Sequence, residues 1–380
     1  MNILHDIVEQ QSPQLDLPTS SGNPRGERPQ PLGPTRWDWD NVKRVLLVRL
    51  RSIGDTVLMT PSLDALKRFL PDTEIDIVVE DWVAPVLAEH PSVNRLVSIE
   101  RGSLKARARV AHEIRSRHYD VVYNLHGGTT ATFLTRATGA RHRVGYASYQ
   151  YSQLHNHQAP SPLLLWGQPK THSVEQQLAL LGWTGVPVSD RPPTRLAIPA
   201  KADARVNSIL FSAGLANAKF ALIHPAAAFA TKQWAANNFA QIVDYLAARN
   251  IATVAIAGPN DRAVLNELVE CSKAHIVLVD LSLPEVAALA ARSHLFVGND
   301  SGIAHIATAV ATPGVVIFGS SNIAHWRPWN TAPAEVVFEE MPCQPCHGYF
   351  CEKFSQPECI LRVPVERVTA AIERLLDQQR

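Results

Sequence analysis

The sequence has no long hydrophobic run, almost no net charge and few cysteines, and each lack excludes a class of protein. No apolar run reaches the roughly 20 residues that span a bilayer, and the N-terminal MNILHDIVEQ lacks the layout of a signal peptide. Lysine and arginine number 36 against 35 acids, so the charge balance implies no nucleic-acid partner. Five cysteines, four of them late in the chain, fit a reducing compartment better than a disulfide framework. We therefore expect a soluble, cytoplasmic protein.

Three sequence motifs are also missing. The first predicted strand is not followed by G-x-G-x-x-G, and the chain contains neither G-x-x-x-x-G-K-[ST] nor H-E-x-x-H. These absences argue against a dinucleotide dehydrogenase, a P-loop NTPase and a zincin.

What is present is an alternation of buried strands and amphipathic helices in two series. This pattern predicts an α/β fold with two doubly wound parallel sheets, and a cleft between two such domains is the default binding site. The predicted divisions are a disordered leader (1–43), a first domain (44–188), a Pro-rich linker (189–199), a second domain (200–342) and a Cys-rich loop with a C-terminal helix (343–380). Within these divisions, Trp37 and Trp39 can attach the leader to the first domain, residues 149–168 are expected to form a surface excursion, and Gly314–Phe318 is expected to close the second sheet.

The stretch RVLLVRLRSIGDTVLMTPSLDAL, Arg44 to Leu66, predicts a buried strand, a polar turn and an amphipathic helix. The turn carries one acid, Asp55. In an open α/β sheet, ligands bind beyond the carboxyl ends of the strands. Asp55 is thereby placed at the mouth of a candidate active site. The alternative is that Asp55 only caps the helix.

The stretch FVGNDSGIAHIAT, Phe296 to Thr308, predicts a second strand–turn–helix unit. We expect Asp300 to be the N-cap, so that the amides of Ser301 and Gly302 point into the cleft as an anion site. Ser301 and His305 lie four residues apart on one helical face, so His305 can donate to the same anion. The alternative is a simple N-cap beside a partly buried histidine.

The stretch IHPAAAFATKQW, Ile223 to Trp234, ends a strand in small residues and then presents Lys232. A lysine there can act as a point charge for a phosphate, and the small residues allow backbone amides to approach it. Taken alone, the lysine could equally be a solvated loop residue.

Two weaker signals follow other predicted strands. Asp261 lies in a Gly-Pro-Asn-Asp sequence and can bind sugar hydroxyls, although the same residues form a good turn. His126, Gly127 and Gly128 end a strand on the cleft side of the first domain, where the two glycines permit close approach of a substrate.

Four cysteines, Cys343, Cys346, Cys351 and Cys359, have the spacing C-x2-C-x4-C-x7-C. Thiolates grouped in this way can bind zinc or an iron–sulfur cluster. Structural zinc sites usually pair two C-x2-C knuckles, and only one is present here, so free or oxidisable thiols are the favoured interpretation.

Four of these stretches together resemble glycosyltransferase family 9, the ADP-heptose:lipopolysaccharide heptosyltransferases of Gram-negative bacteria. They are VRLRSIGDTVLMTPSLDALKRFLPDTEID, YDVVYNLHGGTTATFLTRATGARHRVGY, HPAAAFATKQW and GNDSGIAHIAT, and the similarity runs in order from about Arg44 to Asn330. The resemblance implies a GT-B architecture, with two Rossmann-like domains facing a central cleft. It also implies inverting transfer from a nucleotide sugar, with no metal ion or cofactor.

The resemblance implies roles for individual residues. Asp55 matches the acid that acts as general base on the acceptor hydroxyl, and Lys232 matches the lysine of the family's K-x-W sequence, which contacts donor phosphate. The other matches on the donor side are Asp300, Ser301, Gly302 and His305, with Asp261 a looser match. The residues expected on the acceptor side are Arg51, Ser52, Gly54, His126, Gly127 and Gly128. The family commonly has K-x-W-P, whereas Ala235 stands here in place of the proline.

The implied reaction transfers heptose from ADP-heptose to a lipopolysaccharide core acceptor. Two alternatives remain: transfer of another nucleotide-activated sugar to a glycan or glycolipid, and a nucleotide-sugar-binding protein that has lost catalysis. The acceptor is membrane-held, so the basic helix predicted over Lys105–Arg117 could contact the inner membrane peripherally from the cytoplasmic side, although a solvated face is the ordinary interpretation.

Overall fold

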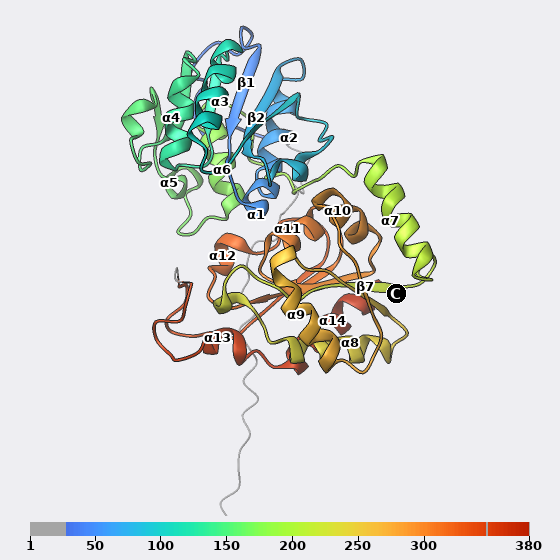
Figure 1. Ribbon diagram of the computed structural model, residues 1–380. Coiled ribbons are helices and arrows are strands. Elements are labelled where there is room, and N and C mark those ends of the chain that lie inside the picture. The colour runs from blue at the N-terminus through green and yellow to red at the C-terminus, as the bar shows by residue number, and fades with distance from the viewer. Residues whose placement is uncertain (1–27, 347–348, 380) are drawn as a thin grey trace, which may run out of the picture.

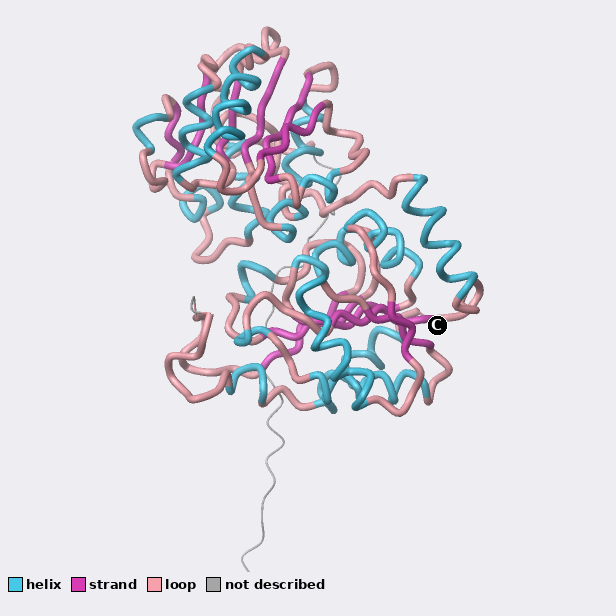
Figure 2. Tube along the Cα trace, viewed as in Figure 1, coloured by secondary structure: helices cyan, strands magenta, loops and turns pink. Residues whose placement is uncertain are grey.

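The computed structural model describes residues 28–346 and 349–379. Within those residues the chain forms two six-stranded sheets, and every neighbouring pair of strands is parallel. Figure 1 shows the two domains one above the other, and Figure 2 shows that helices flank the strands of each sheet. The α/β prediction with two doubly wound domains is confirmed.

The first domain holds the sheet β3-β2-β1-β4-β5-β6. Its strands are β1 (Arg44–Val48), β2 (Glu74–Glu80), β3 (Arg95–Ile99), β4 (Val121–Asn124), β5 (His142–Tyr146) and β6 (His157–Ala159). Its helices are α1 (Ile53–Val57), α2 (Thr60–Phe69), α3 (Leu104–Ser116), α4 (Thr129–Ala137), α5 (Pro162–Trp166) and α6 (Ser173–Gly182), with 3₁₀ turns η1 (Ala84–Leu87) and η2 (Ser152–Leu154).

The second domain holds the sheet β12-β11-β10-β7-β8-β9. Its strands are β7 (Phe220–His224), β8 (Ala252–Ala255), β9 (Ile276–Leu278), β10 (Leu295–Asn299), β11 (Gly314–Phe318) and β12 (Ala334–Phe338). Its helices are α7 (Ala200–Ser212), α8 (Ala236–Ala247), α9 (Arg262–Cys271), α10 (Leu283–Arg292), α11 (Gly302–Ala309), α12 (Ile323–Trp326), α13 (Glu358–Leu361) and α14 (Val365–Asp377), with 3₁₀ turns η3 (Ala230–Lys232) and η4 (Pro259–Asp261).

Both sheets have the same strand order when the strands are counted within each domain. The strand order reverses between β1 and β4 in the first domain, and between β7 and β10 in the second. Such a switch point leaves a crevice at the carboxyl ends of the two strands, where ligands bind in open α/β sheets. The fold therefore defines one candidate site in each domain.

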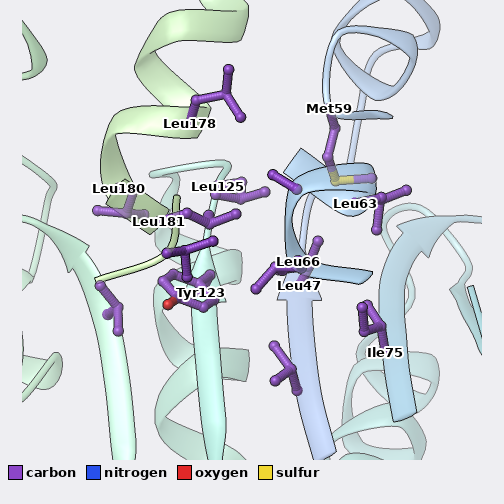
Figure 3. Packing of buried hydrophobic residues seen from close by; sticks show 14 of the residues in the cluster. Leu47, Met59, Leu63, Leu66, Ile75, Tyr123, Leu125, Leu178, Leu180 and Leu181 are labelled. Atoms are coloured by element: carbon purple, nitrogen blue, oxygen red, sulfur yellow. The ribbon is translucent and has the colours of Figure 1, made fainter. Parts of the chain in front are cut away.

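The cores follow from the strand sequences, which are apolar on both faces. In β1, Val45 and Leu47 belong to one buried cluster, and Leu46 and Val48 belong to the cluster on the other face. Figure 3 shows the first of these clusters, where helices α2 and α6 cover the strands with leucine side chains such as Leu63 and Leu181. The second sheet is likewise covered on both faces by helices.

Several sequence predictions need correction. The strand β11 does not close the second sheet, because β12 pairs with it in parallel. The surface excursion predicted over residues 149–168 includes regular structure, namely β6, which extends the first sheet, and helix α5. The helix expected after β1 is divided into α1 and α2, and Pro61 is the second residue of α2, in the first turn, where proline is tolerated.

The predicted leader is described only from residue 28, and residues 1–27 lie outside the described part. From residue 28 the chain packs on the first domain, since Leu32 donates its amide to the carbonyl of Gly182 at 3.0 Å and Trp39 is buried in the core. The burial of these apolar side chains offsets the entropy lost when this segment becomes ordered.

The two domains are in contact. Val57, Val83 and Val86 of the first domain lie in the same buried cluster as residues of α7, α10 and α11. In the other direction, Trp329, beyond α12, is buried in the core of the first domain, and Thr194 donates its hydroxyl to the Trp329 carbonyl at 2.6 Å. Among the described residues, no helix has both the length and the apolar character needed to cross a bilayer.

Candidate active site

On the first-domain side, the central group is the carboxylate of Asp55 in α1. Arg49, the first residue after β1, forms an ion pair with Asp55 and also donates to the carbonyl of Leu125. The second carboxylate oxygen of Asp55 accepts hydrogen bonds from the Ser52 amide at 3.1 Å and the Ser52 hydroxyl at 3.2 Å. Asp55 therefore does cap the start of its helix, as the alternative proposed, and in addition it faces a cation.

The loop after β4 lies beside this pair. The side chain of Asn124 holds it by accepting from the amides of His126 at 3.1 Å and Gly127 at 2.9 Å. Burial, aided by the charge of Arg49, lowers the pKa of His126 to about 4, so this imidazole is neutral at pH 7. Gly127 has φ +78°, and a Cβ there would lie 2.6 Å from the ring of Tyr149. The group that closely approaches Gly127 is therefore the Tyr149 ring, where a substrate was expected.

On the second-domain side, the central group is an ion pair between Lys232 and Asp300. The Lys232 ammonium lies 2.9 Å from Oδ2 of Asp300, and the Ser321 hydroxyl donates to the same oxygen at 2.5 Å. Lys232 ends η3 after β7, Asp300 follows β10, and Ser321 follows β11. Three neighbouring strands therefore contribute to one polar cluster at the carboxyl edge of the sheet.

The loop that carries Lys232 is fixed to the core by two residues. Oδ1 of Asn299 accepts from the Trp234 amide at 3.1 Å, and its Nδ2 donates to the carbonyl of Pro225 at 2.8 Å. The Trp234 indole is fully buried and donates to the carbonyl of Val363 at 2.9 Å. A lysine two residues before such an anchor has a defined position even though its own side chain is long and flexible.

Helix α11 differs from the prediction at its N-terminus. Its N-cap is Ser301, which accepts from the Ala304 amide at 3.3 Å, whereas the carboxylate of Asp300 is engaged by Lys232 and Ser321. The prediction of Asp300 as N-cap was wrong because a cation and a hydroxyl from neighbouring strands compete for its oxygens. Nδ1 of His224 lies 3.4 Å from the Ser301 hydroxyl, and burial lowers the pKa of His224 to about 4.

The two sides meet where α1 contacts α11. A Cβ on Gly54 would lie 2.7 Å from Cδ2 of His305, and a Cβ on Gly302 would lie 2.7 Å from Cβ of Ile53. The absence of both side chains therefore lets the helices touch. The space over Gly302, which was expected to admit a ligand, is occupied by Ile53 of the other domain.

His305 of α11 faces Gly54 of α1 across the contact between the domains. It is buried, and burial lowers its pKa, while the carboxylates of Asp300 and Asp55 oppose that shift and Lys232 adds to it. These influences come from both domains, and the contact of the His305 ring with Gly54 places the imidazole against α1, the helix that carries Asp55. A neutral imidazole in this position can donate one hydrogen bond to an anion.

Ser52 belongs to the first-domain cluster through its two hydrogen bonds to Asp55, and the remaining predicted residues lie at the same edges of the sheets. Arg51 and Ser52 are exposed in the turn before α1, and Gly128 precedes α4. Asp261 is half-buried at the start of α9, after β8, the strand beside β7. No hydrogen bond joins the Asp261 side chain to the Lys232–Asp300 pair within the described residues.

The cysteine-rich loop lies beside the second-domain side. The Cys346 amide donates to the Ser320 carbonyl at 2.9 Å, and the ring of Tyr349 packs on Phe229 with 4.5 Å between centroids. Burial and the neighbouring thiols raise the pKa of Cys359 to about 11. In residues 28–346 and 349–379, no group of three or more His, Cys, Asp or Glu side chains is arranged to hold a metal ion. His347 lies outside those residues.

Sequence reasoning missed Arg49, Ser321 and the anchoring role of Asn299. A signal existed for the first two. Arg49 interrupts an apolar run directly before the polar turn, and Ser321 ends a Gly-Ser-Ser sequence directly after a buried strand. No local signal showed that Asn299 would hold the lysine loop, because its partners are 65 and 74 residues away in sequence.

Chemically, the arrangement combines an ionisable acid with a cluster that can receive negative charge. The carboxylate of Asp55 can accept a proton from a hydroxyl group. Lys232 and His305 can bind the oxygens of a phosphate leaving group, which is stabilisation of the kind worth a few kcal/mol in a preorganised site. The two functions come from different domains, so a substrate pair held between them would be acted on from opposite sides.

Comparison with known proteins shows which proteins this chain is similar to. Residues 107–354 match the family model described as glycosyltransferase family 9 (heptosyltransferase). Lipopolysaccharide heptosyltransferase 3 of Escherichia coli is 29% identical over 350 residues, which cover 86% of this chain and 97% of that protein.

Two solved structures share the fold. The glycosyl transferase family 9 protein from Veillonella parvula superimposes with a TM-score of 0.75 at 21% identity, over 88% of this chain and 97% of its own. The E. coli heptosyltransferase WaaC with ADP superimposes with a TM-score of 0.66 at 20% identity, over 88% of this chain and 98% of its own. The two-domain GT-B architecture implied by the sequence is therefore confirmed.

Proposed function

This chain belongs to glycosyltransferase family 9, and from that premise we propose that it transfers heptose from ADP-heptose to a lipopolysaccharide core acceptor. We further propose that the transfer inverts the anomeric centre and needs no metal ion or other cofactor. The observation that carries the proposal is that α1, the helix of Asp55, touches α11, the helix of His305, where Gly54 faces the His305 ring.

Asp55 is proposed as the general base. A carboxylate has about four lone-pair positions, and the described contacts of Asp55, with Arg49 and with the amide and hydroxyl of Ser52, use three of them. One position is left for the hydroxyl of an acceptor. Removal of that proton as the oxygen attacks the sugar contributes typically 10²–10⁴-fold in rate.

Lys232, His305 and Asp300 are proposed as the leaving-group side. As the glycosyl–phosphate bond breaks, negative charge grows on the diphosphate. Lys232 is a point charge at the place where that charge grows, and His305 supplies a second donor. Asp300 orients the ammonium of Lys232 through the 2.9 Å contact. Ser301 and Asp261 are proposed as further donor contacts. Gly302 is assigned instead to the contact between α1 and α11, because Ile53 fills the space over it.

An inverting transfer needs base and leaving group on opposite faces of the sugar. The acid of the first domain and the cation of the second meet this requirement if the sugar lies between them. The residues proposed on the acceptor side are Arg51, Ser52, Gly54, His126, Gly127 and Gly128. The lipopolysaccharide acceptor is membrane-held, so we place the reaction at the cytoplasmic face of the inner membrane, with the enzyme bound peripherally.

Calorimetric titration with ADP, UDP, GDP and NAD tests the donor. We expect ADP to bind much more tightly than the other three, and transfer from ADP-heptose to be measurable with a truncated lipopolysaccharide acceptor. A preference for UDP or GDP would keep the glycosyltransferase and overturn the assignment of ADP-heptose. If none of the four binds, Lys232 and Asp300 form a structural ion pair and the donor site lies elsewhere.

A further inference from the structure

One surface of the first domain gathers cations that have no counter-ion among residues 28–346 and 349–379. Residues 101–117, which include α3, contain six lysine and arginine residues and one carboxylate, Glu113. Glu113 pairs with Arg95 at 2.6 Å, and Arg117 pairs with Glu74 and Asp76. The other exposed cations of α3 include Lys105, Arg107 and Arg109. Within the described part of the chain, none of them forms an ion pair.

The same surface exposes large apolar side chains. Leu104, in the first turn of α3, is 75% exposed, and Phe133, on the neighbouring helix α4, is 53% exposed. The ring of Phe133 packs beside Tyr151 with 5.6 Å between centroids, and Tyr151 is itself 42% exposed. Arg136, one turn after Phe133, is exposed as well. Figure 1 shows α3 and α4 together on one side of the first domain.

This surface borders the acceptor side of the candidate site. Helices α3 and α4 follow β3 and β4, so their first turns lie at the carboxyl edge of the sheet, the edge at which Asp55 follows β1. Leu104, Lys105 and Phe133 all lie in the first or second turn of their helices. A molecule approaching Asp55 from this side passes these side chains.

We propose that this surface, formed by Leu104, Lys105, Arg107, Arg109, Phe133 and Arg136 and called the basic face below, docks the enzyme on an anionic lipid bilayer. A solvated helix face would need no exposed leucine and phenylalanine, and a protein interface is usually depleted of lysine at its centre. Unpaired cations attract anionic headgroups, and neighbouring apolar side chains insert at the boundary with the acyl chains. The combination therefore fits a lipid surface.

Docking here would present Asp55 to a lipid-held acceptor. The presentation of Asp55 to an acceptor rests on the proposed function, but lipid binding by the basic face requires neither donor nor acceptor. Lipid docking and the proposed function can consequently fail separately. A protein that binds vesicles but does not transfer heptose would overturn the proposed function and leave the basic face as a docking surface.

The test is cosedimentation of the full chain with sucrose-loaded vesicles at low ionic strength. One set contains 30% phosphatidylglycerol in phosphatidylcholine, and the other contains phosphatidylcholine alone. We expect binding to the anionic vesicles only. The triple variant Lys105→Gln/Arg107→Gln/Arg109→Gln should bind on the order of 100-fold more weakly, because each cation near an anionic surface contributes about fivefold. Phe133→Ala should weaken binding roughly tenfold.

The chain offers matched controls on the second domain. Lys201→Gln/Arg205→Gln/Lys273→Gln removes the same charge from exposed positions, and Phe211→Ala removes a phenylalanine that is 78% exposed. Both controls should bind like the parent protein. All variants should transfer heptose normally to a water-soluble acceptor, which shows that they are folded.

Three results would overturn the proposal: no binding of the parent protein to anionic vesicles, equal loss in the test and control triple variants, or binding only when the vesicles contain the acceptor glycolipid. The last result would assign the basic face to the acceptor itself. Tight binding of an acidic protein with no vesicle binding would likewise replace the lipid surface by a protein partner.

Discussion

The two sides of the site are built alike but present opposite charges. In the first domain the acid is the more accessible member of its ion pair, with 18% of the Asp55 side chain exposed against 11% for Arg49. In the second domain the cation is the more accessible member, with 22% of Lys232 exposed against 6% for Asp300. One domain thus offers a base backed by a cation, and the other offers a cation backed by an acid. The same fold therefore has two chemical roles, and the role of each domain depends on which member of its ion pair is the more accessible.

The strongest way to break this comparison is to remove the accessible acid. Asp55→Asn keeps the shape of the side chain and its contact with Ser52, but it removes the proton acceptor. We expect kcat for heptose transfer to fall by 10²–10⁴-fold, while the affinity for ADP stays within about twofold because the donor groups lie in the other domain. Steady-state kinetics and ADP calorimetry on the same preparation measure both.

The reference variant for that experiment is Asp64→Asn, which changes an acid on α2 away from the site. If Asp55→Asn lowers ADP affinity as much as it lowers kcat, Asp55 supports the donor or the fold and another group is the base.

The second test removes the accessible cation. Lys232→Met keeps the length of the side chain and should weaken ADP binding roughly 10- to 100-fold, since hydrogen bonds to charged groups contribute about 1.5–3 kcal/mol. Lys219→Met, at an exposed position of the same domain, is the control. Calorimetry measures both.

The double variant Lys232→Met/Asp300→Asn separates two explanations for that loss. If Lys232 binds the diphosphate directly, the double variant stays weak. If Lys232 only neutralises Asp300, removal of both charges restores most of the affinity, and the assignment of Lys232 to the donor is lost.

The sequence predicted the central residues of both sides but missed a partner on each. Asp55, Lys232 and Asp300 follow buried strands, and the rule that ligands meet the carboxyl ends of strands was enough to bring them together. Arg49 and Ser321 are the partners that decide which charged group is accessible, and their contacts depend on the register of neighbouring strands. The edge strands β12 and β6 were missed because most of their residues are at most partly buried, and β6 is just three residues long.

The domains can also be compared through their neutral histidines. Burial lowers the pKa of His224 in the second domain to about 4, below the value near 6.5 of an exposed histidine. The unfolded chain therefore takes up a proton at a higher pH than the native protein does. The stability contributed by neutral His224 is complete above pH 6.5 and declines by about 3 kcal/mol as the pH falls to 4.

Urea unfolding between pH 7.5 and 4.5 measures this decline. We expect His224→Gln to flatten it, and His126→Gln to do so in the first domain, where the pKa is also lowered to about 4. His112→Gln, at an exposed position on α3, controls for the loss of a histidine elsewhere. An unchanged pH dependence in both test variants would show that carboxylates alone govern the acid sensitivity.

The smallest expected effect concerns the place where the two sides meet. Gly302→Ala adds a Cβ 2.7 Å from Cβ of Ile53 and 3.2 Å from the amide nitrogen of Gly54. The methyl group has no room while α1 and α11 touch, so the helices must separate slightly. Within α11 itself alanine is a better helix former than glycine by up to about 1 kcal/mol, so the second domain should not lose stability.

For Gly302→Ala we expect kcat to fall about tenfold, because a small misplacement of base relative to leaving group is costly, with ADP affinity unchanged. If ADP affinity falls instead and kcat at saturating donor is preserved, Gly302 serves the diphosphate, as the sequence had suggested, and the contact with Ile53 belongs to a state in which the donor is not bound.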